Sequence, residues 1–368
     1  MRFSHRAAIL TVVSTVTGVA GSILLLMAVG CRTGSPSSVV ARSVREARVA
    51  ARPLVIAHRG ASGHRPEHTL PAYALAVEMG ADYIEPDLVS TKDGTLVARH
   101  ENEIGGTTDV AERFPMRRTR KVVDGDTIEG WFTEDFTLAE LRTLRARERL
   151  SFRSHAWDGH FPVPTFDEVL ALADSLGRLR GRPVGVYPET KHPSYFRSIG
   201  LPIEPPLLRA LRARKLDRVD APVFIQSFEV SNLQVLRHET AVRLVLLLSA
   251  KEIPYDRRLA GDPRTGTQRV TPEGLREIAR FADAIGVNSR MIVGADSSSV
   301  PTTLVDDAHH AGLMVHVWTL RSEPMFLARR YGGDPVAEVR EFVRLGVDGM
   351  FGDSPDVLMK GVGERSGR

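Results

Sequence analysis

The sequence is poor in cysteine, in aromatic residues and in runs of like charge. Its 368 residues include one cysteine, Cys31, so no disulfide can form within the chain. Only 6% of the residues are aromatic, and no basic run carries interleaved aromatics, which argues against nucleic acid as a partner. The formal net charge of +4 is mild and gives only weak support for an anionic ligand.

Two common functional patterns are absent as well. The Gly-Gly pairs at 105–106 and 332–333 lack the Lys-Ser/Thr of a phosphate-binding loop, which argues against nucleotide binding. Ser62 has no surrounding Gly-x-Ser-x-Gly, which argues against a serine hydrolase. With 42% hydrophobic and 26% charged residues, the chain nevertheless has the composition of a globular protein with ample core material.

Residues 1–30 have the pattern of a targeting segment. A short basic region precedes an uncharged stretch at 7–30, which predicts an export signal, with an uncleaved membrane anchor as the alternative. Residues 27–31 resemble the end of a bacterial lipoprotein signal, whose cysteine is lipidated, although Ala28 stands where leucine is common. We therefore expect an exported protein anchored to the cell membrane through Cys31, or otherwise a periplasmic or secreted one. The Ser-, Arg- and Ala-rich stretch at 31–52 predicts a flexible linker.

Between residues 53 and 362, short apolar runs alternate with segments of helical period. The expected strands are 54–58, 82–88, 184–189, 222–227, 243–248, 283–287, 313–318 and 347–350. The expected helices include 69–79, 165–176, 203–214, 229–238, 302–311 and 335–345. Strands that alternate with helices in this number predict an α/β domain, a (β/α)₈ TIM barrel.

Some stretches depart from this alternation. The run 95–99 follows an expected strand after a tight Lys-Asp-Gly turn, which predicts a hairpin. Residues 101–160 are polar with one clear helical pattern at 137–147, and a structureless loop of that length is uncommon inside a domain. We expect this stretch to form a small lobe inserted over the C-terminal face of the barrel. Residues 251–270 form a second long connection, which could act as another lid.

Polar residues occur at the ends of the first expected strands. His58-Arg59 ends the first run, Glu85 and Asp87 lie in the second, and His100 follows the third. Catalytic groups of α/β barrels are mounted at the C-terminal ends of the strands. These charges therefore predict an active site, since packing does not require them.

A series of motifs, in this order, closely resembles the glycerophosphodiester phosphodiesterases. The matching segments are His58-Arg59-Gly60-Ala61, Pro66-Glu67-His68-Thr69, 80–87, Thr91-Lys92-Asp93-Gly94 with His100, 108–115, 186–191, 225–228 and 315–319. The later segments are similar to the periplasmic bacterial subgroup, and the resemblance covers 53–360. The chain departs from the family pattern at Glu101, where aspartate is usual, and at Thr190, where isoleucine or leucine is common.

The resemblance implies a barrel of the PLC-like phosphodiesterase type with an inserted lobe and a divalent metal, often calcium. It also implies hydrolysis of a glycerophosphodiester to sn-glycerol 3-phosphate and an alcohol, with His58 and His100 as acid and base. Imidazole suits this work because it titrates near neutral pH. In one route that the family suggests, the glycerol 2-hydroxyl attacks phosphorus and water then opens the cyclic phosphate. Which histidine begins as the base is left open.

Three carboxylates on strands that we expect to be neighbours are the candidate metal ligands: Glu85, Asp87 and Glu189. Residues 85 and 87 point to the same face of a strand, and three buried carboxylates without a counter-charge are very unfavourable. We expect a hard cation with oxygen ligands, Ca²⁺ first and Mg²⁺ as the alternative, over zinc. The competing interpretation is an ion-pair network with Arg59 and Lys191.

The candidate substrate-binding residues are Arg59, Lys191, Gln226, Phe228 and Trp318. The guanidinium of Arg59 can bind phosphate in a bidentate manner, and Lys191 adds a second positive charge. Salt bridges to the carboxylates are the alternative for both. The other three follow later strands, where they line a glycerol or alcohol pocket or pack into the core.

Four other nearby residues are expected to have structural roles. We expect Glu67 to support the site, with metal ligation as the alternative. We expect Thr69 to be the N-cap of the next helix and His316 to pack within its strand. We expect no catalysis by His68.

The sequence thus predicts a metal-dependent phosphodiesterase that acts on small diesters such as glycerophosphocholine. The alternative among enzymes is a related barrel hydrolase for lysophospholipids, sphingomyelin-type lipids or teichoic-acid glycerol phosphate, which the shape of the pocket would distinguish. The alternative of another class is a non-catalytic surface binding protein. The presence of every expected catalytic residue argues against that last interpretation.

Overall fold

The computed structural model describes residues 52–296 and 298–363. The predicted export signal, Cys31 and the predicted linker up to residue 51 lie outside this part of the chain. Within the described ranges, no helix has the length and apolar character that crossing a membrane requires.

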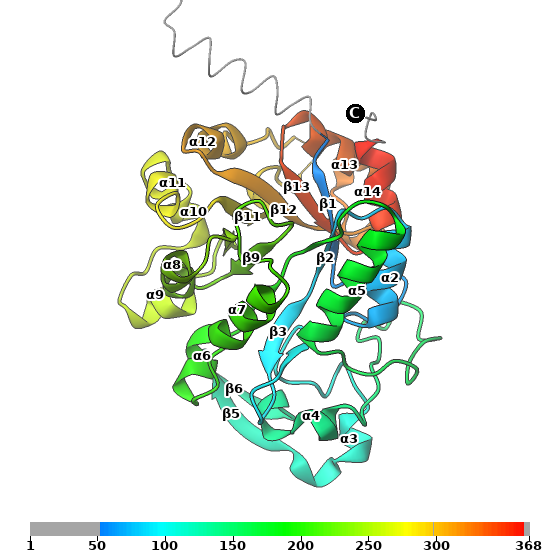
Figure 1. Ribbon diagram of the computed structural model, residues 1–368. Coiled ribbons are helices and arrows are strands. Elements are labelled where there is room, and N and C mark those ends of the chain that lie inside the picture. The colour runs from blue at the N-terminus through cyan, green and yellow to red at the C-terminus, as the bar shows by residue number, and fades with distance from the viewer. Residues whose placement is uncertain (1–51, 297, 364–368) are drawn as a thin grey trace, which may run out of the picture. The chain divides into compact units, whose positions relative to one another are not determined.

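A closed barrel of eight parallel strands, two of them interrupted, organises the described residues (Figure 1). The strands are β1 (Leu54–His58), β2 (Tyr83–Glu85) continued by β3 (Asp87–Ser90), β7 (Gly185–Val186) continued by β8 (Glu189–Thr190), β9 (Phe224–Ser227), β10 (Arg243–Leu248), β11 (Ala284–Asn288), β12 (Met314–Leu320) and β13 (Gly349–Gly352). The sheet closes because β1 pairs with both β13 and β2, and the two interrupted strands pair with each other. The predicted (β/α)₈ barrel is confirmed.

Prolines explain the two interruptions. Pro86 separates β2 from β3, and Pro188 lies between β7 and β8. Proline has no N–H to donate to the ladder, but its carbonyl still accepts. The backbone N–H of Glu189 donates to the carbonyl of Pro86 at 2.9 Å, so the parallel pairing continues past the break.

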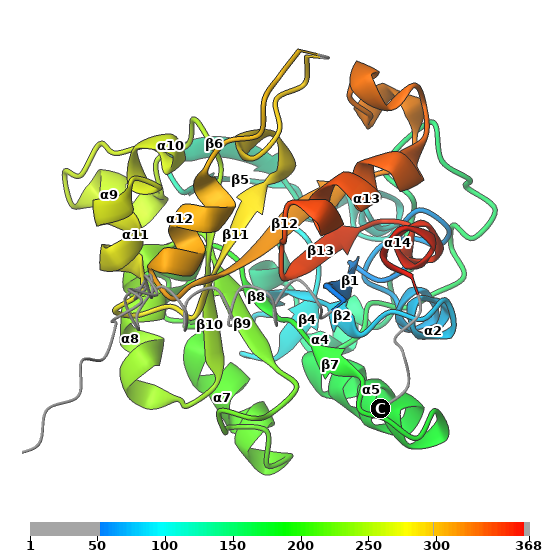
Figure 2. The same ribbon diagram turned by 90° about the horizontal axis from the view of Figure 1, so that it is seen from above.

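Helices cover the outside of the barrel (Figure 2). They are α2 (Leu70–Glu78), α5 (Phe166–Leu179), α6 (Pro193–Ser198), α7 (Glu204–Ala213), α8 (Val230–Glu239), α11 (Pro272–Ile278), α12 (Leu304–His310), α13 (Pro335–Arg344) and α14 (Pro355–Val362), with short 3₁₀ turns η3 (Ser289–Met291), η4 (Pro324–Phe326) and η5 (Arg329–Tyr331). The predicted N-cap is confirmed, since Thr69 Oγ1 accepts from the Ala72 N–H at 3.3 Å. In α5, Thr165 and Glu168 form a capping box, which explains why this helix begins where it does.

Aromatic rings fill the barrel interior. Tyr187 stacks on Phe224 with ring centroids 4.9 Å apart, and its hydroxyl lies 2.6 Å from Nδ1 of His316. His316 is fully buried, as predicted. Gly349 makes room for this histidine, because a Cβ atom there would lie 2.8 Å from the imidazole carbon Cδ2. The part of the barrel interior that these rings occupy is therefore packed.

The long segment after β4 (Leu96–Ala98) has secondary structure of its own. It contains α3 (Val110–Arg113), η1 (Pro115–Arg117), a hairpin of β5 (Thr119–Val123) and β6 (Asp126–Gly130), η2 (Thr133–Asp135) and α4 (Leu138–Leu141). β4 pairs antiparallel with β3, which confirms the hairpin predicted there. In Figure 1 the segment lies at the bottom of the view, and we call residues 101–164 the inserted segment.

The prediction of a helix at 137–147 is wrong beyond the first turn, because α4 ends at Leu141. Distant residues take the amides that a longer helix would need: the Arg145 N–H donates to Asp109 Oδ1 at 2.7 Å, and the Ala146 N–H donates to the Phe161 carbonyl at 2.8 Å. The second long connection, 251–270, holds α9 (Tyr255–Leu259) and α10 (Gly266–Arg269).

Candidate active site

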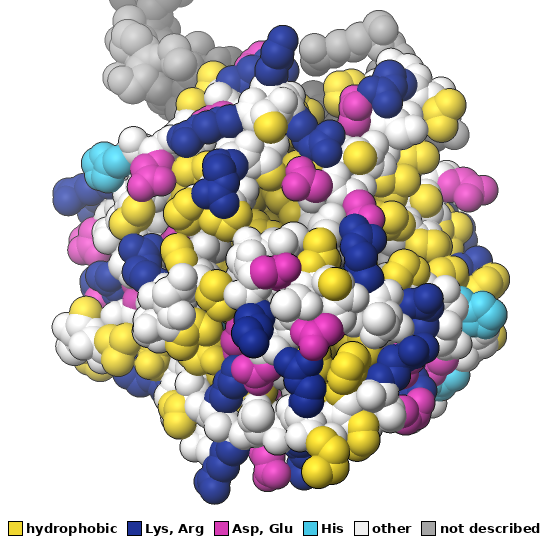
Figure 3. Space-filling model, turned by 60° about the horizontal axis from the view of Figure 1, so that its bottom comes forward, with side chains coloured by type: hydrophobic (Ala, Val, Ile, Leu, Met, Phe, Trp, Pro, Cys, Tyr) yellow, Lys and Arg dark blue, Asp and Glu magenta, His cyan; other side chains and the backbone are white. Residues whose placement is uncertain are grey.

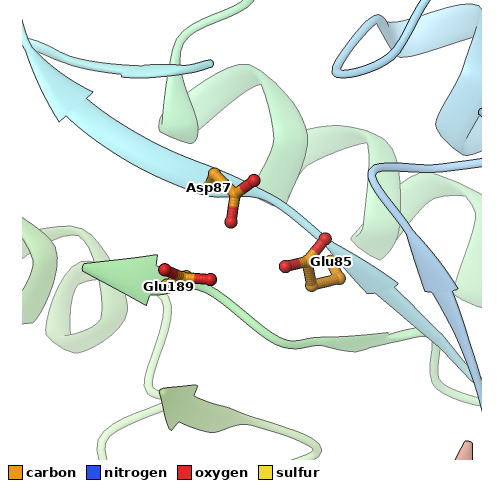
Figure 4. A group of neighbouring side chains, drawn as sticks. All are labelled: Glu85, Asp87 and Glu189. Carbon is orange, nitrogen blue, oxygen red and sulfur yellow. The ribbon is translucent and has the colours of Figure 1, made fainter. Parts of the chain in front are cut away.

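Three carboxylates meet at the interrupted strands (Figure 4). Glu85 and Asp87 flank the break between β2 and β3, and Asp87 is the register partner of Glu189 on β8. One carboxylate oxygen from each residue lies within 4.8 Å of the others, and the side chains point toward one another. The structure therefore brings together the three residues predicted as metal ligands.

The carboxylates are buried, which makes their ionisation difficult. Burial, together with repulsion from Asp87 and Glu189, raises the pKa of Glu85 well above its usual range. Burial, reinforced by Asp87, raises the pKa of Glu189 to about 8. Burial also opposes ionisation of Asp87, but His68 and nearby cations hold the pKa of this carboxyl well below its ordinary value.

The acidic cluster could hold a metal ion. Oδ1 of Asp87 is buried and has no hydrogen-bond partner, and such an oxygen costs free energy unless something binds it. Hard divalent cations take several carboxylate oxygens, so the donor set fits such an ion. The ion pairs of the competing interpretation are present too: Lys191 Nζ lies 3.1 Å from Glu189 Oε1, and Arg59 Nε lies 3.4 Å from Asp87 Oδ2.

His68 forms a buried hydrogen bond with Asp87. Its Nε2 lies 2.9 Å from Asp87 Oδ2, and its Nδ1 lies 2.8 Å from the Tyr73 hydroxyl. Burial lowers the pKa of His68 to about 4, so the ring is neutral at neutral pH. A neutral ring that donates to Asp87 from Nε2 accepts the tyrosine hydroxyl at Nδ1, which fixes its tautomer.

Arg59 begins the loop after β1 with a backbone φ of 60°. Its N–H donates to Glu85 Oε2 at 2.8 Å, and its guanidinium Nη1 donates to Glu67 Oε2 at 2.9 Å. Arg149, from the inserted segment, donates to the same Glu67 oxygen at 3.0 Å. Glu67 therefore holds Arg59 in place, in agreement with the structural role predicted for it.

His58, at the end of β1, has a buried carboxylate partner. Its Nδ1 lies 2.6 Å from Oδ1 of Asp353. The other oxygen of Asp353, Oδ2, forms ion pairs with Arg153 Nη2 at 2.6 Å and with Arg321 Nε at 3.1 Å. Burial and the charge of Arg59 lower the pKa of His58, against the attraction of Asp353. A carboxylate at Nδ1 favours the tautomer whose Nε2 is free to exchange a proton.

His100 follows β4 and has a more exposed partner. Its Nδ1 lies 3.1 Å from Glu101 Oε1, and the side chains are 29% and 40% exposed, respectively. Burial of the ring, with the positive charges of Arg59 and Lys191, holds the pKa of His100 well below its usual value. In the protein without substrate, the pKa of each candidate acid–base histidine therefore lies below that of a free imidazole.

A cavity of ≈ 160 Å³ collects most of these groups. It is lined by His58, Arg59, Glu85, His100, Glu189, Lys191, Gln226, Phe228, Leu247, Trp318, Thr319, Arg321 and Phe351. Gln226 donates from Nε2 to Glu85 Oε1 at 2.9 Å, and its own Oε1 is buried without a partner. Phe228 and Trp318 meet edge to face with ring centroids 5.8 Å apart. All residues predicted for the site, Asp87 excepted, thus line one cavity.

A wider cavity of ≈ 770 Å³ adjoins the first and shares His100, Glu189, Lys191, Phe228, Leu247 and Trp318 with it. The hairpin of the inserted segment and the connection 251–270 form part of its other walls. Figure 3 brings the bottom of the Figure 1 view forward, and on that face positive and negative side chains are mixed. No single sign of charge dominates the face drawn there.

Sequence reasoning missed the residues that hold the histidines. Asp353 carries the same signal as Glu85, a carboxylate at the end of a barrel strand, and could have been found. Arg153 has no such signal, because it lies 200 positions from Asp353 in a segment without a strand pattern.

The fold and the cavity define a parallel α/β barrel with two histidines, an acidic cluster and three cations at the C-terminal ends of its strands. Residues 58–357 match the model of the Glycerophosphoryl diester phosphodiesterase family. The chain belongs to this family. Its members are enzymes, and this chain is a phosphodiesterase of that class.

Relatives agree with this assignment. The chain is 35% identical over 320 residues to the glycerophosphodiester phosphodiesterase GDPD6 of Arabidopsis thaliana, covering 82% of this chain and 84% of that one. It is 29% identical to a glycerophosphodiester phosphodiesterase of Haemophilus influenzae, covering 92% and 98%. The fold is similar to that of an Oleispira antarctica phosphodiesterase solved with the product sn-glycerol-3-phosphate, with a TM-score of 0.53, 20% identity and coverage of 88% and 98%.

Proposed function

We propose that the protein hydrolyses small glycerophosphodiesters such as glycerophosphocholine to sn-glycerol 3-phosphate and an alcohol, with Ca²⁺ as its metal. The observation that carries the proposal is the convergence of two histidines, an acidic cluster and three cations on one cavity. The product bound to the Oleispira antarctica relative supports the same substrate class.

The charged groups divide the work of binding the phosphate. Arg59 and Lys191 line the cavity and offer N–H donors to the non-bridging oxygens. Glu85, Asp87 and Glu189 would hold the cation, which supplies further neutralisation of the phosphate charge when it is bound. The fixed orientation of Arg59, held by Glu67, keeps one donor in place before the substrate arrives.

The histidines move the protons. One, as the neutral ring, takes the proton of the glycerol 2-hydroxyl as its oxygen bonds to phosphorus. The other, protonated when the anionic phosphate is bound beside it, gives that proton to the alcohol oxygen as the phosphorus–oxygen bond breaks. Water then opens the cyclic phosphate with the two roles reversed, which restores both histidines. Asp353 and Glu101 stabilise the imidazolium that forms at each site, because each carboxylate faces Nδ1.

The size of the inner cavity favours a small polar substrate. A volume of ≈ 160 Å³ accommodates glycerol phosphate and not an acyl chain, and Gln226 offers an unpartnered acceptor to a glycerol hydroxyl. The wider adjoining cavity can receive the alcohol. These dimensions argue against lysophospholipids as the main substrate.

The test is release of sn-glycerol 3-phosphate from glycerophosphocholine by the purified protein, measured before and after EDTA and after Ca²⁺ is restored. We expect activity that EDTA removes and Ca²⁺ returns. Recovery with Mg²⁺ alone would contradict the choice of calcium. A folded protein that turns over lysophosphatidylcholine or a glycerol phosphate polymer, and no small diester, would contradict the substrate class.

A further inference from the structure

A chain of charged side chains leads away from His100 toward the inserted segment. Glu101 contacts His100 with one carboxylate oxygen and His192 with the other: Oε1 lies 3.1 Å from His100 Nδ1, and Oε2 lies 2.7 Å from His192 Nε2. His192 in turn places Nδ1 2.7 Å from Oδ2 of Asp124. The chain thus links a candidate acid–base residue to a turn more than twenty positions further along.

The geometry at His192 fixes its charge. Both ring nitrogens lie at hydrogen-bond distance from carboxylate oxygens, and carboxylates accept only. An imidazolium donates to both, whereas a neutral ring would turn a lone pair toward one of them. The flanking carboxylates overcome burial and raise the pKa of His192 to about 9, so the ring carries a positive charge at neutral pH.

The far end of the chain is anchored in the inserted segment. Asp124 occupies the turn between β5 and β6 with a backbone φ of 51°. Arg258, from the connection 251–270, donates to the backbone carbonyl of Asp124. Both long connections over this end of the barrel therefore hold the carboxylate that faces His192.

Without the contact from His192, few interactions would fix the side-chain rotamer of Glu101. Its side chain is 40% exposed, and its other cationic neighbour, Lys191, lies 3.9 Å away and is already paired with Glu189 at 3.1 Å. An exposed carboxylate with a single weak partner samples several rotamers. The bond from His192 is the shortest contact of Glu101, so it is the one that selects the rotamer facing His100.

We propose that His192 and Asp124 are positioning residues that hold Glu101, and through it the imidazole of His100, in the orientation that proton transfer requires. The inference rests on the proposed acid–base role of His100. It gives the inserted segment a part in turnover through Asp124. Both residues also line the wider cavity proposed to receive the alcohol, so their positioning role is measured as kcat at saturating substrate.

The experiment compares His192→Asn and Asp124→Asn with the wild-type protein on glycerophosphocholine. Asparagine tolerates the positive φ of both positions, 45° and 51°, so the turns are kept while the charges are lost. We expect kcat at saturating glycerophosphocholine to fall about tenfold in His192→Asn and less in Asp124→Asn. A change in KM alone would mean that the two residues only bind the alcohol, and it would overturn the positioning role. Glu101→Gln in the His192→Asn background should add little to the loss, because the two residues act in one chain.

The matched control is His309→Asn. His309 also pairs with a carboxylate, Asp348 at 2.8 Å, but at the opposite end of the barrel strands, and its loss should leave kcat unchanged. Thermal unfolding of each variant checks that it is folded. If His192→Asn does not fold, the kcat of Asp124→Asn tests the inference. If the folded variants keep the wild-type kcat while His100→Ala is inactive, the positioning role of His192 and Asp124 is wrong and the proposed role of His100 stands. Activity retained by His100→Ala would instead overturn the proposed role of His100.

Discussion

The two candidate acid–base histidines are held in contrasting ways. His58 faces Asp353, whose side chain is 2% exposed and is itself fixed by Arg153 and Arg321. His100 faces Glu101, whose side chain is 40% exposed. One partner is thus a buried carboxylate directly after a barrel strand, and the other is a carboxylate near solvent.

The difference teaches how the inserted segment completes the site. On the side of His58, the segment's Arg153 contacts Asp353 directly. On the side of His100, the segment supplies both Glu101 and Asp124, which His192 links. A buried ion pair is screened little by water and salt, whereas a partly exposed one is screened strongly. We therefore expect the orientation of His58 to be robust and that of His100 to depend on conditions.

The largest expected effect comes from removing the rings themselves. His58→Ala and His100→Ala should each fold normally yet lose turnover by about 10²–10⁴-fold, since general acid and base catalysis contribute that much. Initial rates of sn-glycerol 3-phosphate release measure the loss, and circular dichroism checks the fold. Substantial activity in either variant would remove that histidine from the mechanism.

The next prediction separates the two partners. Asp353→Asn removes the buried carboxylate that Arg153 and Arg321 share, while Arg153 keeps Glu323 at 2.7 Å. Breaking a buried charge pair by removing one partner costs up to about 3–5 kcal/mol of stability. Glu101→Gln removes a half-exposed partner and should cost less than about 1 kcal/mol. Urea unfolding of both variants tests the contrast.

Equal stabilities of Asp353→Asn and Glu101→Gln would show that the buried and exposed partners are equivalent. The expected result is a clearly lower urea midpoint for Asp353→Asn, with an unchanged slope. Ser198→Ala, an exposed substitution at the end of α6, serves as a reference for the scatter of the method.

The sequence was sufficient to predict the barrel and most of the cavity lining, and the reason is local. Each strand is a short apolar run, and the residues that line the cavity follow directly from the ends of those runs. His58, Glu85 and Glu189 could therefore be placed together without coordinates. The split at Pro86 and Pro188 changes the hydrogen-bond ladder but not the direction in which the carboxylates point.

The supporting contacts could not be predicted, because they join segments far apart in the chain. Arg153 meets Asp353 across 200 positions, and His192 meets Asp124 across 68. Both arginine and histidine are ordinary surface residues in their local patterns. Only the path of the inserted segment, which has no barrel periodicity, decides that they face the site.

The smallest expected effect is a pH dependence of stability on the side of the site that holds His100. The folded pKa of His192, about 9, lies above its ordinary value of 6.5, so the folded state binds its proton more tightly than the unfolded state. Its stabilising contribution is fully present below pH 6.5 and is lost as the pH rises through 9. The difference in melting temperature between the wild-type protein and His192→Asn should therefore shrink from pH 6.5 to pH 9. His58 shifts in the opposite direction, since burial lowers its pKa, and it cannot produce this trend. A difference that stays constant across the range would mean that His192 is neutral in the folded protein, and the bridge between Glu101 and Asp124 would then lack the charge that holds it.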